Sequence, residues 1–142
     1  MPYKTKFIPI NPSKYVGDVN NIICRSLWER KFCKYLDENS SIIRWASEEL
    51  RIPYMCPVKG KLSFYYPDFL FETEENTEVK TFLVEIKPKK QTSPPKNKKS
   101  KSYNQDYLTY RINNSKWESA TEYCKKNGWT FKILTEEHLH IK

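Results

Sequence analysis

The chain has 142 residues, of which 25 are Lys or Arg and 17 are Asp or Glu, so its formal net charge is +8. The length favours one domain with a core of its own, and no stretch approaches the ~20 apolar residues of a membrane-spanning helix. The excess of positive charge indicates a polyanionic partner. A basic surface that only serves solubility is the alternative.

The cysteines contain no C-x-x-C pair, which argues against a zinc ribbon and against a thiol redox motif. We expect reduced thiols that lie mostly in the core, as in cytosolic proteins, at Cys24, Cys33, Cys56 and Cys124. The N-terminal residues lack the apolar run of a signal peptide, so we expect none.

Residues 1–17 contain three prolines and show no apolar periodicity, which predicts an extended arm ahead of a domain over 18–142. The arm mixes aromatic rings with cations. This composition suits contact with a partner, and it equally suits a strap packed on its own domain.

The first helix is predicted over about residues 20–38, capped by Asp18 or Asn20. Glu29 lies about 100° around the helix from the tryptophan before it, at the edge of the buried stripe. Its carboxylate could support a site or could simply pair with Arg25. The stripe itself follows from apolar residues four apart, namely Cys24, Trp28, Phe32 and Leu36.

Two strands are predicted over residues 41–53 and 61–71, with a turn near Gly60. Pro67 argues for an edge position or a bulge in the second strand. Asp68 follows it directly and is a carboxylate in otherwise apolar surroundings, so it needs a partner.

An acidic turn over residues 72–78 is expected to lead into a strand over 79–87. Glu85 and Lys87 are two residues apart, so on a strand they project from one face while Ile86 points into the core. A carboxylate and an ammonium at the end of a buried strand must both be desolvated. This cost favours a functional role over an idle ion pair.

The stretch 89–101 is predicted to be a mobile basic loop that hangs over the site formed by the preceding strand. Phosphate contacts are favoured over a merely solvated run of charge. The lysines expected to bind nucleic acid are Lys89, Lys90, Lys96, Lys98, Lys99 and Lys101.

After the loop, a helix over about residues 103–112 and a second one capped by Asn114 or Ser115 are predicted, with Gly128 ending the second. A last strand follows over 129–134. This order of helices and strands predicts an α/β domain with a mixed sheet.

Asp68 and Glu85 together could hold Mg²⁺, or Mn²⁺ in its place, because such ions prefer oxygen ligands. The ion could polarise a phosphodiester and lower the pKa of a bound water. Lys87 could orient or deprotonate that water, or stabilise charge on the phosphate. Glu48 could be a further acid beside the metal, with a surface ion pair as the alternative.

Pro67-Asp68 followed by Glu85-Ile86-Lys87 resembles the signature of the PD-(D/E)XK nucleases, and Glu29 matches the acid that these enzymes often carry on their first helix. Further matches in chain order resemble the head completion nucleases of T-even-type bacteriophages. They are Ser13-Lys14-Tyr15-x-Gly17-Asp18, Arg25-Ser26-x-Trp28-Glu29, Trp45-x-Ser47-Glu48, Ile52-Pro53-Tyr54, Glu85-Ile86-Lys87-Pro88-Lys89-Lys90 and Lys116-Trp117.

The resemblance implies a restriction-endonuclease-like single α/β domain, in which helices flank a mixed central sheet. It implies a metal-dependent DNA endonuclease with Asp68 and Glu85 as metal ligands, Glu29 as a supporting acid and Lys87 as the catalytic lysine. The implied role is phage head completion after DNA packaging, in the cytoplasm of the infected bacterium or in the virion.

The implied partners are double-stranded DNA or its ends and proteins of the phage head or neck, and the oligomeric state stays open. Two other interpretations also stay open. One is a structural DNA-terminus or neck protein on a nuclease fold. The other is a junction resolvase or a nuclease that nicks transposon ends.

Overall fold

The computed structural model describes residues 4–139. The elements follow one another along the chain in the order β1 (Thr5–Lys6), η1 (Pro12–Lys14), β2 (Ile23–Cys24), α1 (Leu27–Glu38), β3 (Ile42–Ser47), β4 (Ile52–Cys56), β5 (Lys61–Tyr65), β6 (Phe69–Glu75), β7 (Glu78–Ile86), η2 (Lys89–Thr92), α2 (Tyr103–Asn127) and β8 (Thr130–Leu134).

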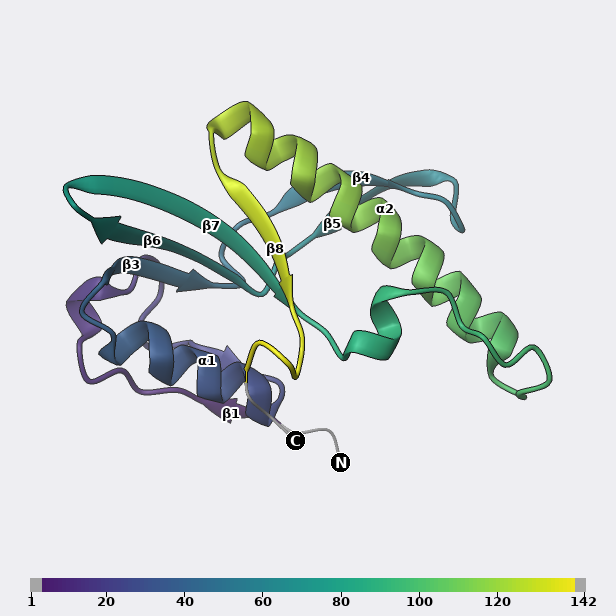
Figure 1. Cartoon of the computed structure of the whole chain (residues 1–142), viewed down its shortest axis with the longest axis horizontal. Coiled ribbons are helices and arrows are strands. Elements are labelled where there is room, and N and C mark those ends of the chain that lie inside the picture. The colour runs from purple at the N-terminus through teal and green to yellow at the C-terminus, as the bar shows by residue number, and fades with distance from the viewer. Residues whose placement is uncertain (1–3, 140–142) are drawn as a thin grey trace.

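A four-stranded sheet in the order β3-β6-β7-β8 forms the centre of the molecule (Figure 1). β3 pairs antiparallel with β6 and β6 pairs antiparallel with β7, whereas β7 and β8 run parallel. Parallel neighbours need a crossover connection, and α2 supplies it between β7 and β8. The prediction of a mixed sheet is confirmed.

Side chains along β7 alternate between two apolar cores, one on each face of the sheet. Val84 and Ile86 pack with Phe32 of α1 in the first core. Leu83 packs with Trp117 of α2 in the second core, which also includes the β4–β5 hairpin. The two long helices therefore flank the sheet, as expected.

The described part of the N-terminal arm packs on the domain. Phe7 and Tyr15 are buried in the core beside α1, and Tyr15 forms a parallel bridge with Trp45 of β3. These contacts correspond to a strap packed on its own domain, which was one of the two alternatives for the arm. The ammonium of Lys14 adds three hydrogen bonds at the end of α1, to the backbone oxygens of Leu36, Asp37 and Asn39.

The first helix begins later than predicted. Ser26 is its N-cap and accepts a 3.1 Å hydrogen bond from the backbone N–H of Glu29, which is a strong start signal. The residues before it form β2, which pairs with β1 of the arm. The predicted start at residue 20, capped by Asp18 or Asn20, is therefore wrong, because pairing with the arm competes successfully with helix formation.

Each of the two strands predicted before residue 72 is in fact two strands. The strand predicted over residues 41–53 corresponds to β3 and β4, and the one predicted over 61–71 corresponds to β5 and β6. Gly60 lies in the turn between β4 and β5, as predicted. Pro67 separates β5 from β6, since proline cannot donate to a ladder. The acids expected in a turn lie mainly in β6 and β7. The turn itself is Asn76-Thr77, with φ of 51° and 66°.

One continuous helix of 25 residues, α2, replaces the two predicted helices. Asn113 is buried within it, and the Ser115 hydroxyl donates a 2.8 Å hydrogen bond to the Met55 carbonyl in β4. Packing on the β4–β5 hairpin thus stabilises the helical conformation at Asn114 and Ser115, two residues that favour a helix cap. Gly128 ends the helix with φ of 73°, as predicted. No helix within residues 4–139 is long and apolar enough to cross a membrane.

Candidate metal centre and active site

Asp68 and Glu85 lie opposite each other at the open end of the β6–β7 hairpin. The register pairs Phe69 with Val84, so the residue before β6 faces the residue after Val84. Asp68 Oδ2 accepts a 2.7 Å hydrogen bond from the backbone N–H of Ile86. This bond fixes the first carboxylate to the strand that carries the second.

The side chains of Glu85 in β7 and of Lys87, the first residue after this strand, lie close together. Only 6% of Glu85 is exposed, and its Oε2 lies 4.0 Å from Lys87 Nζ. Ile86 between them packs into the core beside α1, as the strand alternation predicts. The backbone N–H of Lys87 donates to Leu134 O at 3.0 Å, so pairing with β8 holds the lysine in place.

Glu29 lies in the first turn of α1, where its Oε2 accepts a 3.1 Å hydrogen bond from the backbone N–H of Arg25. Its carboxylate is half-buried. The Arg25 guanidinium, which the sequence offered as a partner for Glu29, pairs instead with Glu48. The helix acid is thus held by a backbone donor and not by a cationic side chain.

Glu48 comes directly after β3 and lies next to Asp68. Ser47 pairs with Phe69 in the β3–β6 ladder, and the backbone N–H of Glu48 donates to Asp68 O at 3.1 Å. One carboxylate oxygen from each of Glu29, Glu48 and Asp68 lies within 4.8 Å of the others. Glu48 therefore forms the predicted surface ion pair, and it also lies beside the predicted metal ligands; its role at a metal stays a prediction.

Burial of these acids, more than repulsion between them, raises their pKa values. Burial and the neighbouring Glu85 carboxylate raise the pKa of Asp68 well above its ordinary value, against the opposing hydrogen bond from Ile86. Burial also raises the pKa of Glu85, with the Lys87 ammonium opposing it. The pKa of Glu29 rises through burial too. Burial therefore disfavours the charged form of all three carboxylates.

The donor set fits a hard divalent cation. Oxygen ligands are what Mg²⁺ and Mn²⁺ prefer. Glu29, Glu48 and Asp68 form a cluster of three carboxylates, and Glu85 adjoins this cluster at Asp68. In addition, Glu85 Oε1 is buried and forms no hydrogen bond of regular geometry among the described residues, although the Tyr65 hydroxyl lies close to this carboxylate. A buried anionic oxygen without a partner is costly, and a bound cation would remove that cost.

Tyr65 is a neighbour of the cluster that the sequence pattern did not single out. Its hydroxyl is buried near Glu85 and the indole nitrogen of Trp117. Burial, and then the negative charge of Glu85, raise the pKa of Tyr65. The phenol therefore stays protonated and adds a neutral wall to the site. It lies three residues before Asp68, a spacing with no distinctive signal.

The predicted basic loop begins at η2 beside the site and then runs along α2 to the helix end that points away from the sheet (Figure 1). Lys89 is tied to the C-terminal turn, with Nζ 2.8 Å from Glu137 Oε1. The later lysines are exposed and lie along this course instead of over the carboxylates, namely Lys96, Lys98, Lys99 and Lys101.

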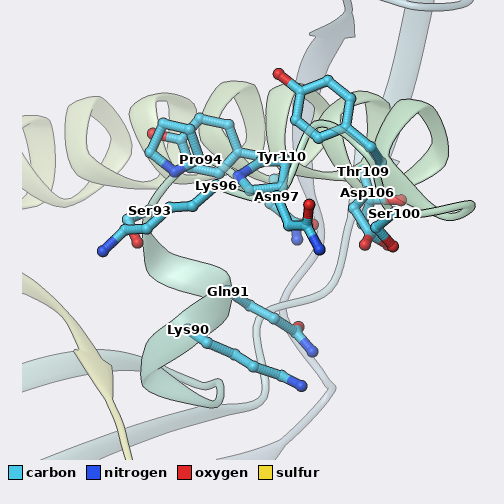
Figure 2. A pocket seen from close by; sticks show the side chains of 13 residues that line it. Lys90, Gln91, Ser93, Pro94, Lys96, Asn97, Ser100, Asp106, Thr109 and Tyr110 are labelled. Carbon is cyan, nitrogen blue, oxygen red and sulfur yellow. The ribbon is translucent and has the colours of Figure 1, made fainter.

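Between this loop and α2 is a pocket of about 550 Å³ (Figure 2). Lys90 and Lys96 line it from the loop, and Tyr110 and Asp106 line it from the helix. Neither Glu85 nor any of the three clustered acids borders it, so the pocket is separate from the candidate metal centre.

Two comparisons with known proteins bear on this site. Residues 39–136 match the family model described as TnsA-like endonuclease N terminal. The chain is also 39% identical, over 145 residues, to the head completion nuclease of Enterobacteria phage T4, with 98% of this chain and 95% of that protein covered. The region that matches the endonuclease model contains Glu48, Asp68, Glu85 and Lys87.

Proposed function

The chain belongs to the nuclease family of the phage T4 head completion nuclease and carries a TnsA-like endonuclease region, and from this premise we propose that it is a Mg²⁺-dependent DNA endonuclease. Its reaction is the hydrolysis of phosphodiester bonds in double-stranded DNA or at DNA ends. It acts in the infected bacterium, when filled phage heads are completed after packaging.

The arrangement of Asp68, Glu85 and Lys87 carries this proposal. Two carboxylates face each other across a ladder, one of them has a buried oxygen without a partner among the described residues, and an ammonium lies 4.0 Å from the same group. Most buried polar atoms have a hydrogen-bond partner, so a buried carboxylate oxygen without one supports a site that a cation completes.

Asp68 and Glu85 would hold the divalent ion, with Glu29 as a further acid. When bound, the ion supplies Lewis-acid activation of the phosphate and lowers the pKa of a bound water. The Lys87 ammonium is held on the same strand face as Glu85, where it would stabilise negative charge that develops on the phosphate. Water would add to phosphorus and lose a proton, while the ester P–O bond breaks and the departing oxygen takes up a proton, so that the net change is the addition of one water molecule.

DNA binding would depend mainly on phosphate contacts from the lysines of the loop over residues 89–101. Lysine is a flexible point charge that gives little base readout. The same run contributes strongly to the net charge of +8. Affinity for DNA should therefore decrease steeply as salt increases.

A structural DNA-terminus or neck protein without catalysis is the second candidate. The complete set of Asp68, Glu85 and Lys87 in one cluster favours activity over this candidate. A junction resolvase or a transposon end-nicking nuclease is less favoured, because the similarity to the phage T4 protein extends over 98% of this chain.

The decisive experiment incubates the purified chain with supercoiled plasmid and Mg²⁺ or Mn²⁺. Glu85→Ala and Lys87→Ala should each reduce cleavage about a hundredfold or more. Glu78→Ala and Lys80→Ala are matched controls, because they change the same residue types at exposed positions on the same strand. Wild-type protein without metal-dependent cleavage, or cleavage that survives both site substitutions, would contradict the proposal.

A binding measurement tests the loop separately. Replacing Lys98, Lys99 and Lys101 with Gln should lower DNA affinity about tenfold at moderate salt and flatten the salt dependence, since fewer counterions are released. Fluorescence anisotropy with labelled duplex DNA at several salt concentrations measures both quantities. If the salt dependence of DNA affinity did not change, the loop would not be part of the DNA-binding surface.

A further inference from the structure

Arg25 is the cationic side chain that pairs with Glu48 at the rim of the carboxylate cluster. Its Nε lies 3.0 Å from Glu48 Oε1, and its Nη2 lies 3.3 Å from Oε2. The negative charges of Glu29 and Asp68 also act on this guanidinium. Arg25 thus occupies a position where a positive charge meets three acids.

A second surface ion pair, Arg44–Glu72, shows what is particular about this one. The arginine and glutamate side chains are 55% and 25% exposed in Arg25–Glu48, against 59% and 26% in Arg44–Glu72. The second pair joins β3 to β6 within the sheet, and its glutamate is not part of the acidic cluster. The two ion pairs are equally exposed, so they differ in that only Arg25–Glu48 lies at the acidic cluster.

The backbone holds Glu48 at the cluster whether or not Arg25 is present. Glu48 has φ of 55°, which is unusual for a residue other than glycine. Its N–H is bonded to Asp68 O, and β3–β6 pairing ends at the residue before it. The side chain therefore starts from a fixed point beside Asp68.

On the inner side of the cluster, the Glu85 carboxylate contacts Asp68 and is more than nine-tenths buried. Among residues 4–139 its Oε1 forms no hydrogen bond of regular geometry, and the group close to this carboxylate on its buried side is the neutral Tyr65 hydroxyl. Arg25 is on the exposed side and leaves this oxygen without a partner. The single arginine at the rim therefore does not compensate the whole cluster, and a cation seated among the carboxylates would do so better.

We propose that Glu48 is a ligand of the divalent cation held by this cluster, and that Arg25 is its internal counter-cation, which the metal displaces. The inference rests on the proposed metal-dependent function. It deepens that function by adding a ligand and a competitor to the site.

Displacement of the Arg25 side chain by the metal has a consequence for DNA binding. A guanidinium released from Glu48 would stay beside the carboxylates, because the backbone N–H of Arg25 is bonded to Glu29. Arginine binds phosphate oxygens through two parallel hydrogen bonds. Metal binding would therefore convert an arginine occupied by a carboxylate into one available to a DNA phosphate.

The test is calorimetric titration of the full chain with Mn²⁺ in the absence of DNA. Glu48→Gln should weaken Mn²⁺ binding about tenfold or more, as expected for loss of an anionic ligand. Arg25→Gln should strengthen it about threefold to tenfold, because the competing cation is gone. Arg44→Gln is the matched control and should stay within about twofold, as surface pairs usually contribute little.

The double variant Arg25→Gln/Glu48→Gln separates competition from general electrostatics. If the two residues compete through Glu48, the gain from Arg25→Gln should fall to within about twofold in the Glu48→Gln background, which is non-additive behaviour. Thermal melts of each variant verify that it is folded.

The outcomes distinguish this inference from the proposed function. Wild-type affinity retained in Glu48→Gln, or an Arg25→Gln variant that binds Mn²⁺ no better than wild type, would overturn the role of this pair and leave the nuclease proposal standing. Wild-type protein that binds no Mn²⁺, even with DNA present, would overturn both.

Discussion

The β6–β7 hairpin carries opposed acids at both of its ends, and the two ends behave differently. At the tip, Glu75 pairs with Glu78, and both are exposed. At the open end, Asp68 faces Glu85, which is 6% exposed. Like charges directly across a ladder destabilise it, but water screens them at the tip. Burial, and not the pairing itself, gives the open end its chemistry.

Asp68→Asn should show the largest difference in cleavage activity between a substitution at the open end and one at the tip. The amide keeps an oxygen that can accept the hydrogen bond from Ile86 but loses the charge that a metal needs. We expect plasmid cleavage to fall about a thousandfold, the size typical of losing a central charge-stabilising group. Glu75→Gln makes the equivalent change at the tip and should stay within about twofold. Equal losses in both variants would contradict the comparison.

Metal ions should stabilise the protein through the acids at the open end of the hairpin and not through those at its tip. At a free Mn²⁺ concentration of a hundred times the dissociation constant, the free energy of unfolding should rise by about 2.7 kcal/mol. Denaturant titrations with and without Mn²⁺ measure this. Glu75→Gln should keep the full effect, whereas Asp68→Asn should lose most of it. A gain that persists in Asp68→Asn would place the ion elsewhere.

Without metal, the acids at the open end should lower the free energy of unfolding as the pH rises. The pKa values of Asp68 and Glu85 are raised in the folded state. The folded state therefore binds protons more tightly than the unfolded state, and stability from this pair is lost as the pH increases through the raised pKa values.

Asp68→Asn should accordingly increase the free energy of unfolding near pH 7 by about 1 kcal/mol, a usual size for single substitutions. The gain should shrink as the pH decreases toward 4, because protonation of the wild-type acids, whose pKa values are raised, removes their charge. Denaturant midpoints over this pH range provide the measurement, and a gain independent of pH would exclude the electrostatic cause.

The tip should respond to a backbone change and not to a charge change. Thr77 has φ of 66°, which is strained for a β-branched residue. Thr77→Gly should therefore stabilise the protein by about 0.5 kcal/mol without altering nuclease activity. Thermal unfolding and plasmid cleavage test the two halves of this prediction. A drop in activity would mean that the tip also acts on the site.

Much of the open end could be predicted from local sequence. Glu85 and Lys87 share a strand face because they are two residues apart. The Asp68–Glu85 spacing is accommodated by one long hairpin. Gly128 and the final strand follow from equally local signals. These features depend on neighbours in the chain, which is why pattern analysis reaches them.

Other features depend on contacts between distant segments. Glu48 reaches Asp68 only because Ser47 pairs with Phe69, a register that no local pattern specifies. α2 continues through Ser115 because that hydroxyl bonds to Met55 in another element. Likewise, α1 is shortened because residues 23–24 pair with the arm. In each case a tertiary contact overrides local propensity.

The tight turn at Asn76-Thr77 also bears on the order of events in folding. Hairpin contacts form within microseconds, and those nearest the turn close the shortest loop, so the acids at the open end would be joined last. Interactions formed late change the rate of unfolding more than the rate of folding. A metal ion at Asp68 and Glu85 would therefore act as a latch that slows the opening of the completed hairpin.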